Sequence, residues 1–247
     1  MSLRGKVAVV TGGNRGLGLA ITRKLASERC DVIIAHAQDD TGAAAVVRAL
    51  SVLPGKVTSV RTDISAAAGV DDLLDGIREK HGRLDVFVHN AATYHPMASS
   101  DLDAESCATD MRVALGPFLY GTKKLTDLFP AEGGRVVVVS SLGARSVIPG
   151  YVGLGMAKAA LENLVRYLAV DLAARGVTVN AVAGGKLDER VEQGDDPISA
   201  MVAVRTPTGR LARREELADA VFLLCQAEAA ALRGQVLTVD GGLSLLA

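Results

Sequence analysis

Short apolar runs alternate along the chain with longer segments in which apolar and polar positions mix. Most of the short runs are continuous, which is typical of parallel strands buried on both faces of a sheet. The pattern predicts strands at 7–11, 31–35, 57–62, 84–89, 135–140, 177–181 and 235–239, and helices at about 16–29, 40–52, 66–81, 103–129, 152–175 and 214–227. We therefore expect one α/β domain over residues 1–247, a Rossmann fold whose doubly wound, seven-stranded parallel sheet carries helices on both faces.

One segment departs from this rhythm. Residues 184–210 are polar, contain Gly and Pro, and have only weak helical character. An excursion between the last two strands lies outside the sheet, where it can cover a ligand. We expect a substrate lid there, with a passive surface excursion as the alternative.

Composition and charge narrow the function classes. Hydrophobic residues make up 49% of the chain and aromatic residues 3%, so small and branched side chains must fill a large core. A formal net charge of -1 argues against nonspecific nucleic-acid binding, and no apolar stretch reaches the roughly 20 residues that a membrane span requires. Cys30, Cys107 and Cys225 show no disulfide or zinc spacing, so we expect three small core residues and no metal. The chain starts directly in a strand, without room for a signal peptide, and we expect a cytoplasmic protein.

A glycine-rich turn joins the first strand to the first helix. Its sequence, Thr-Gly-Gly-Asn-Arg-Gly-Leu-Gly, places glycines where the backbone must turn tightly and approach a phosphate. The free N–H groups and the positive dipole end of a helix follow directly. The turn predicts a dinucleotide site formed by Gly12, Asn14, Arg15, Gly16, Leu17 and Gly18.

The end of the second strand bears on cofactor choice. An acid there would bind the adenine ribose 2′-OH and select NAD, but the sequence continues Ala35-His36-Ala37-Gln38. Arg15 could face a 2′-phosphate, so we favour NADPH over NADH. We expect His36 to belong to the same cofactor site. Asp39 and Asp40 lie just beyond and weaken this preference, although capping of the next helix is their more frequent role.

Two further segments follow strands at the edge where open α/β sheets bind ligands. Asp63 and Ile64 follow the third strand, and Asn90, Ala91 and Ala92 follow the fourth. The small side chains at 91 and 92 would let a flat cofactor ring approach the backbone. Ordinary turn residues are the alternative for either segment taken alone.

Ser140 and Ser141 follow the fifth strand, and the next helix brings Tyr151 and Lys158. Together with the glycine-rich turn, the Asn-Ala-Ala segment and a terminal Asp-Gly-Gly, these residues resemble the short-chain dehydrogenase/reductase family over essentially the whole chain. The resemblance implies a nicotinamide cofactor and a catalytic group of Tyr151, Lys158 and Ser141.

The spacing of the tyrosine and the lysine departs from most of that family. Leu154 occupies the usual tyrosine position, and the Tyr-x6-Lys spacing resembles the NADPH-dependent enoyl-acyl carrier protein reductases. Seven helical residues span about 10.5 Å along the axis and four span about 6 Å. In enoyl reduction, hydride enters the β-carbon and negative charge collects on an oxygen two carbons away, so a displaced phenol matches a displaced oxyanion.

This resemblance implies reduction of the carbon–carbon double bond of an α,β-unsaturated acyl thioester on acyl carrier protein, in fatty acid or polyketide biosynthesis. It implies that Lys158 holds the ribose hydroxyls, that Gly184 and Leu187 lie at the nicotinamide, and that the helices at 103–129 and 152–175 build a homotetramer. Val113 stands where most of the family has a proton-relay asparagine, and we interpret His89 as structural.

Two alternatives stay open. Because Ser141 occupies the usual serine position of the family, a carbonyl or enone reductase of natural-product biosynthesis is one alternative. A non-catalytic NAD(P)-sensing protein is the other. The sequence is compatible with any acyl chain length and with either acyl carrier protein or coenzyme A as the thioester carrier.

Overall fold

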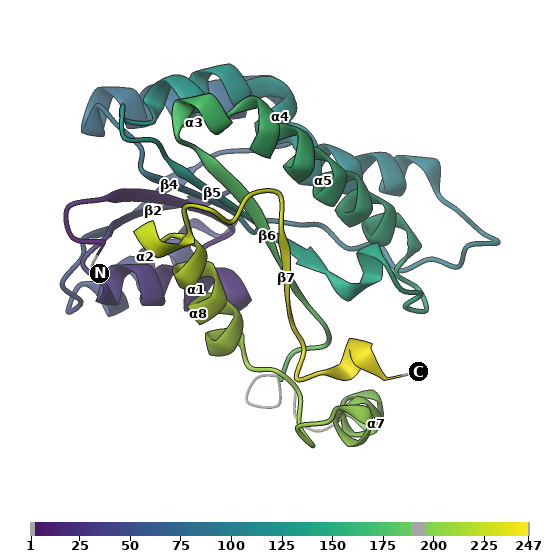
Figure 1. The fold of residues 1–247 in the computed structure, drawn as a ribbon. Helices are drawn as coiled ribbons and strands as arrows, with labels where there is room; N and C mark the ends of the chain where they lie inside the picture. The colour runs from purple at the N-terminus through teal and green to yellow at the C-terminus, as the bar shows by residue number, and fades with distance from the viewer. Residues whose placement is uncertain (1–2, 189–195, 247) are drawn as a thin grey trace.

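A seven-stranded parallel sheet forms the centre of the molecule, with strand order β3-β2-β1-β4-β5-β6-β7 (Figure 1). The computed structural model describes residues 3–188 and 196–246. The order reverses between β1 and β4, which creates the switch point where such sheets bind ligands. The predicted fold class is confirmed. The strands are β1 Val7–Thr11, β2 Asp31–His36, β3 Val57–Arg61, β4 Val86–His89, β5 Arg135–Ser141, β6 Thr178–Gly184 and β7 Val236–Val239.

Helices cover both faces of the sheet (Figure 1). Along β1, Val7 and Val9 pack into one apolar cluster while Ala8 and Val10 pack into the other, because successive side chains of a strand point to opposite faces. The first cluster is closed by α3 Ala67–His81, α4 Ala104–Leu128 and α5 Val152–Asp171, and the second by α1 Gly16–Ser27, α2 Asp40–Leu50 and α8 Arg214–Leu224. Of the helices in the described ranges, none combines the length and apolar character needed to cross a bilayer.

The boundaries differ from the sequence prediction at several ends. The strand expected at 84–89 begins at Val86, and the one expected at 177–181 continues to Gly184. The helix expected at 152–175 ends at Asp171 and is followed by a 3-10 turn, η2 Ala173–Arg175. The other short 3-10 turns are η1 Leu142–Ala144, η3 Ala227–Ala229 and η4 Leu243–Leu245.

The expected lid segment contains a helix, α7 Pro197–Arg205. Asp196 caps it by accepting the Ser199 N–H at 2.8 Å, and proline occupies its first turn, where a missing N–H is harmless. Within the expected lid, residues 189–195 lie outside the described residues. Weak helical character at 184–210 therefore concealed one well-capped helix.

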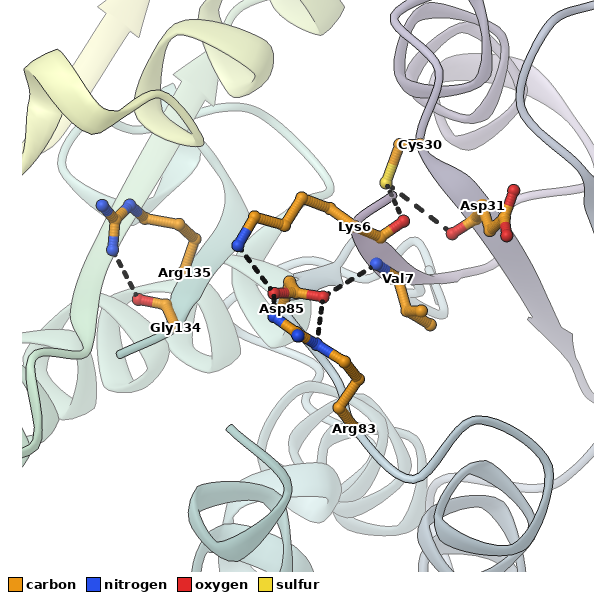
Figure 2. A network of polar contacts seen from close by, with 8 residues as sticks. All are labelled: Lys6, Val7, Cys30, Asp31, Arg83, Asp85, Gly134 and Arg135. Atoms are coloured by element: carbon orange, nitrogen blue, oxygen red, sulfur yellow. Dashed lines mark hydrogen bonds and ion pairs between the residues drawn. The ribbon is translucent and has the colours of Figure 1, made fainter. Parts of the chain in front are cut away.

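A buried carboxylate ties the amino edge of the sheet together (Figure 2). Asp85, just before β4, accepts the Val7 N–H at 2.9 Å, Lys6 Nζ at 3.1 Å and Arg83 Nε at 3.1 Å. Burial raises the pKa of Asp85, but the hydrogen bonds from Arg83, Val7 and Lys6 outweigh it and the pKa is lowered overall. This network aligns β1 and β4 at the edge opposite the switch point.

Candidate active site

A cleft of about 730 Å³ opens at the carboxyl edge of the sheet, over the switch point. Its walls come from the loops after β1, β2, β3 and β4. All the residues that the sequence predicted in those loops line it, namely Gly12, Asn14, Arg15, Gly16, Leu17, Gly18, His36, Asp63, Ile64, Asn90, Ala91 and Ala92. The structure thus brings together four segments that are far apart in the sequence.

The glycine-rich turn fits a pyrophosphate. Gly12 has φ +66°, and a Cβ on Gly18 would lie 2.0 Å from the Gly12 carbonyl oxygen, so neither position accepts a side chain without strain. Arg15, the N-cap of α1, is extended and its side chain makes no cap hydrogen bond within the described residues. The N–H groups of the first turn of α1 are therefore left for an anion, in the field of the helix dipole.

His89 is fully buried at the end of β4 and is neutral. Its burial lowers its pKa to about 3, and the charge of Lys158 acts in the same direction. Nε2 lies 3.0 Å from the Ala114 carbonyl oxygen, which can only accept, so Nε2 carries the hydrogen. Nδ1 then accepts the Thr11 hydroxyl at 3.0 Å. This geometry agrees with the interpretation of His89 as a structural residue.

The same threonine fixes the Asn-Ala-Ala turn. Thr11 Oγ1 accepts the N–H groups of Asn90 and Ala91, each at 3.0 Å. Asn90 Nδ2 in turn donates to the Thr11 carbonyl oxygen at 3.0 Å and lies 3.3 Å from that of Gly12. The loops after β1 and β4 therefore form one rigid floor for the cleft.

Both acids beyond β2 are engaged. Asp39 caps α2 by accepting the Gly42 N–H at 2.9 Å, as the capping interpretation expected. Asp40 accepts a hydrogen bond from Arg61 at 3.1 Å. Asp39 lines the cleft but its carboxylate is used by the helix, which removes the main objection to a 2′-phosphate at this end.

The sequence analysis missed several residues of the cleft wall. Arg214, at the start of α8, lines the cleft with the β1 and β2 loops. No local motif points to it, because it enters from a distant part of the chain. The other wall residues outside the predicted cofactor set are Ala35, Ala37, Gln38, Asp39, Thr62, Thr93 and Val113.

Tyr151 lies immediately ahead of α5, as its N-cap. Its ring packs on Gly143, where a Cβ would lie 2.4 Å from the ring, and the Tyr94 ring lies 5.5 Å away. Burial raises the pKa of Tyr151, while the nearby Ser141 side chain acts in the opposite direction. The phenol is therefore protonated, and the predicted serine is close enough to influence it.

Leu154 cannot take the usual tyrosine role. It is 5% exposed and packs with Ala114 and Ala157 in a small apolar cluster between α4 and α5. Tyr151 is thus the phenol that the start of α5 presents near Ser141.

Lys158 is buried under the carboxyl end of β5. Its side chain is 3% exposed, and Nζ donates to the Val139 carbonyl oxygen at 2.7 Å. Burial lowers the pKa of Lys158 to about 8, so the amine is protonated at neutral pH but titrates close to it.

Five predicted residues lie outside the cleft wall: besides Ser141, Tyr151 and Lys158, these are Gly184 and Leu187. Gly184 ends β6 and is packed against the Leu217 side chain, where a Cβ would lie 2.6 Å from it. Leu187 pairs with Ala212 in an isolated bridge beyond the strand. Neither is brought to the four loops that form the cleft.

Comparison with known proteins decides the family. The family described as enoyl-(acyl carrier protein) reductase matches residues 12–244. The chain is 34% identical over 250 residues to the 1-cyclohexenylcarbonyl-CoA reductase of Streptomyces collinus, which covers 99% of this chain and 89% of that protein. The chain belongs to the short-chain dehydrogenase/reductase family.

Other members of the short-chain dehydrogenase/reductase family are similar over nearly their full length. The cis-4-hydroxycyclohexanecarboxylate dehydrogenase of Sinomonas cyclohexanicum is 37% identical over 240 residues, with 96% of each chain covered. The Pseudomonas aeruginosa RhlG/NADP active-site complex has a TM-score of 0.89 at 30% identity, and covers 98% of this chain and 97% of that one. This short-chain dehydrogenase/reductase is an oxidoreductase of a family that binds NAD(P), and the varied names of its relatives leave the substrate to be argued from the site.

Proposed function

We propose that this short-chain dehydrogenase/reductase reduces the carbon–carbon double bond of an α,β-unsaturated acyl thioester with NADPH. The observation that carries the proposal is the position of Tyr151 ahead of α5, seven residues before Lys158, while Leu154 is part of the core. The family description and the name of the Streptomyces collinus relative both refer to reduction of such a conjugated thioester or its close analogue, and support the proposal.

The chemistry follows from the positions of three side chains. A bound nicotinamide supplies hydride to the β-carbon of the substrate. Tyr151 donates a hydrogen bond to the thioester oxygen, where negative charge then collects, and Ser141 orients the phenol. Lys158, protonated at neutral pH, holds the ribose hydroxyls and adds positive charge next to the oxyanion. Loss of one oxyanion donor raises a barrier by roughly 3–4 kcal/mol.

The preference for NADPH rests on the adenosine end of the cleft. Arg15 and Arg214 both line it, while the carboxylates of Asp39 and Asp40 are engaged with α2 and Arg61. Guanidinium groups bind a phosphate with charge and directed N–H donors, whereas an engaged carboxylate is poorly available to a ribose hydroxyl.

We extend the proposal to the lid and to assembly. Residues 184–210, which include α7, would cover the acyl chain, which is delivered on acyl carrier protein or coenzyme A. Exposed apolar side chains on α4 and α5 support a homotetramer built through these helices, among them Leu119 at 65%, Tyr167 at 65% and Val170 at 76% exposure. Large apolar side chains that are exposed on neighbouring helices are a frequent feature of interfaces.

A second candidate is reduction of a carbonyl or enone. The nearness of Ser141 to Tyr151 favours it, because such a pair can hold a ketone oxygen next to the hydride-accepting carbon. The name of the Sinomonas cyclohexanicum relative, a hydroxyacid dehydrogenase, is consistent with such chemistry.

One assay separates these functions. Purified protein is incubated with NADPH or NADH and with crotonyl or acetoacetyl thioesters of coenzyme A and acyl carrier protein, and cofactor oxidation is followed by absorbance. We expect oxidation of NADPH with the crotonyl thioesters. Oxidation with acetoacetyl thioesters alone would support the second candidate, and cofactor binding without oxidation on both would support a sensing protein.

A further inference from the structure

A buried carboxylate on α4 lies beside the loop that follows β4. Asp110 is 0% exposed, and its Oδ1 accepts the Thr93 hydroxyl at 2.7 Å and His95 Nδ1 at 2.8 Å. Its Oδ2 is buried and has no hydrogen-bond partner among the described residues. A Cβ on Gly153 would lie 3.1 Å from Oδ2, so the carboxylate reaches the first turn of α5, just beyond Tyr151.

Core packing alone does not explain this carboxylate. A buried charge is costly unless it is fully paired, and one oxygen of Asp110 has no partner in the described part of the chain. An apolar side chain of similar volume would fill the same space without that cost. The donors that Asp110 does hold, Thr93 and His95, both belong to the loop after β4. Its contacts therefore indicate a role in orienting that loop.

The Asp110 carboxylate determines which ring nitrogen of neutral His95 carries the hydrogen. A carboxylate oxygen accepts, so the ring hydrogen of neutral His95 lies on Nδ1 and Nε2 is the nitrogen that takes up and releases a proton. Nε2 has no hydrogen-bond partner in the described part of the chain. The side chain is 39% exposed, so water can reach Nε2 and return a proton to it. A histidine bonded through Nδ1 to a buried carboxylate is the arrangement of many general acids and bases.

The loop that carries His95 is attached to the reacting end of the site. On one side of it, Thr93 lines the cleft. On the other, the Tyr94 ring lies 5.5 Å from the Tyr151 ring, and Met97 is bridged to Tyr151. Cys107, expected in the core, is only half-buried and packs against this loop through Met97. His95 is thus held next to the catalytic tyrosine, between two anchored residues.

Reduction of a conjugated double bond needs a proton at carbon as well as a donor at oxygen. Tyr151 is assigned to the oxygen, and α4 presents Val113, an apolar side chain that transfers no proton, to the cleft. We propose that His95, oriented by Asp110, is the acid that protonates the α-carbon of the substrate. This inference rests on the proposed enoyl thioester reduction.

The step balances. Hydride forms a C–H bond at the β-carbon while the π electrons of the double bond shift to the thioester oxygen, giving an enolate and oxidised cofactor. The enolate then takes the proton from Nε2 of the His95 imidazolium at the α-carbon, and the carbonyl is restored. Neutral His95 regains a proton from water, and Tyr151 keeps its own.

The test is the reduction of crotonyl-CoA by NADPH in D2O, with kcat measured and the butyryl product analysed by NMR. Wild-type protein is expected to place one deuterium on the α-carbon in a single configuration. In His95→Gln, an amide can still donate to Asp110 but supplies no proton, so we expect kcat to fall roughly 100-fold and deuterium to enter from water in both configurations. His81→Gln, at the end of α3 and the opposite edge of the sheet, is the matched control and is expected to match wild type.

Asp110→Asn keeps the shape of the side chain and removes its charge. We expect a loss of kcat and mixed α-configuration, as in His95→Gln. A slower His95→Gln that retains one configuration would reduce His95 to a residue that positions the loop and would overturn the proposal. An unchanged rate and configuration would overturn it while leaving enoyl reduction intact, whereas wild type that makes no butyryl product would contradict the proposed function and this inference with it.

Discussion

At the scale of single residues, burial shapes the site by acting against charge. It lowers the pKa of His89 to about 3 and that of Lys158 to about 8. His89 is therefore neutral at pH 7, and serves as a fixed bridge between Thr11 and Ala114. Lys158 is still a cation at neutral pH, but it loses its charge as the pH rises past about 8.

The lowered pKa of Lys158 predicts a pH limit on turnover. In the proposed function the cation binds ribose hydroxyls and stabilises the oxyanion, and it is present below about pH 8 and lost above. We expect kcat/KM to fall as pH rises through this value. Lys158→Arg, whose guanidinium stays charged, should be slower overall but show no decline there. A decline that persists unchanged in Lys158→Arg would assign it to another group.

Tyr151→Phe removes the hydroxyl while it keeps the ring against Gly143 and Tyr94. Because the lost donor acts on the transition state, we expect kcat to fall by roughly 100- to 1,000-fold. The dissociation constant of NADPH, measured by fluorescence titration, should stay within about twofold of wild type, since the phenol acts on the substrate oxygen. Tyr94→Phe is the matched control, and a comparable loss there would mean that the ring contact rather than the Tyr151 hydroxyl matters.

At the scale of elements, the start of each helix decides what it can do. Among the residues that the structure describes, no side chain caps the α1 N-terminus, which lies at the cleft, whereas Asp39 caps the α2 N-terminus. The α5 N-terminus places Tyr151 outside the regular helix, so helical arithmetic over seven residues gives only an approximate height for the phenol. Cap residues, more than helix length, separate these roles.

The glycine-rich turn gives a matched pair of substitutions. In Gly18→Ala, a Cβ would lie 2.0 Å from the Gly12 carbonyl oxygen, so the turn must open and NADPH affinity should fall at least 10-fold. In Gly76→Ala, on α3, the new Cβ meets nothing within 4 Å, and the protein should become more stable by about 0.5–1 kcal/mol. Titration calorimetry and urea unfolding measure the two effects. Full NADPH affinity in Gly18→Ala would contradict the assigned phosphate turn.

Local sequence patterns predicted most of the fold and the cofactor-binding loops. Features that depend on contacts between distant parts of the chain could not be predicted from them. Continuous apolar runs indicate buried strands, and the position of Gly12–Gly18 after the first strand indicates a phosphate turn. The positions of Arg214 and Asp110 were not predicted, because each lies on an element whose own sequence resembles an ordinary helix. The residues assigned by resemblance lie outside the cleft wall in this structure, namely Ser141, Tyr151, Lys158, Gly184 and Leu187.

At the scale of the whole molecule, the two edges of the sheet have different duties. The carboxyl edge carries the cleft, with glycine turns and a lowered lysine pKa that favour function over stability. The amino edge carries Asp85, whose hydrogen bonds to Lys6, Val7 and Arg83 join β1 to β4 (Figure 2). We infer that the polar interactions that stabilise the fold are concentrated at the amino edge, away from the cleft.

Asp85→Asn tests that division of labour. The folded-state pKa of Asp85 lies below the ordinary value of 3.8, so its charge stabilises the fold above that value and this contribution is lost as pH falls through the folded-state pKa. We expect the variant to be less stable by about 2–3 kcal/mol at pH 7, with the difference from wild type shrinking below about pH 4. Asp75→Asn, an exposed partner of Lys124, should change stability by less than about 1 kcal/mol. Urea unfolding at both pH values measures this, and an equal effect of the two substitutions would contradict the account.

The central claim is that the phenol ahead of α5 directs hydride to a carbon–carbon double bond. It is tested most directly by supplying NADPH deuterated at the transferable position to an equimolar mixture of crotonyl and acetoacetyl thioesters, and locating the deuterium by mass spectrometry and NMR. The account predicts deuterium at the β-carbon of butyryl thioester. Deuterium on the carbinol carbon of 3-hydroxybutyryl thioester, with crotonyl thioester recovered unchanged, would contradict it.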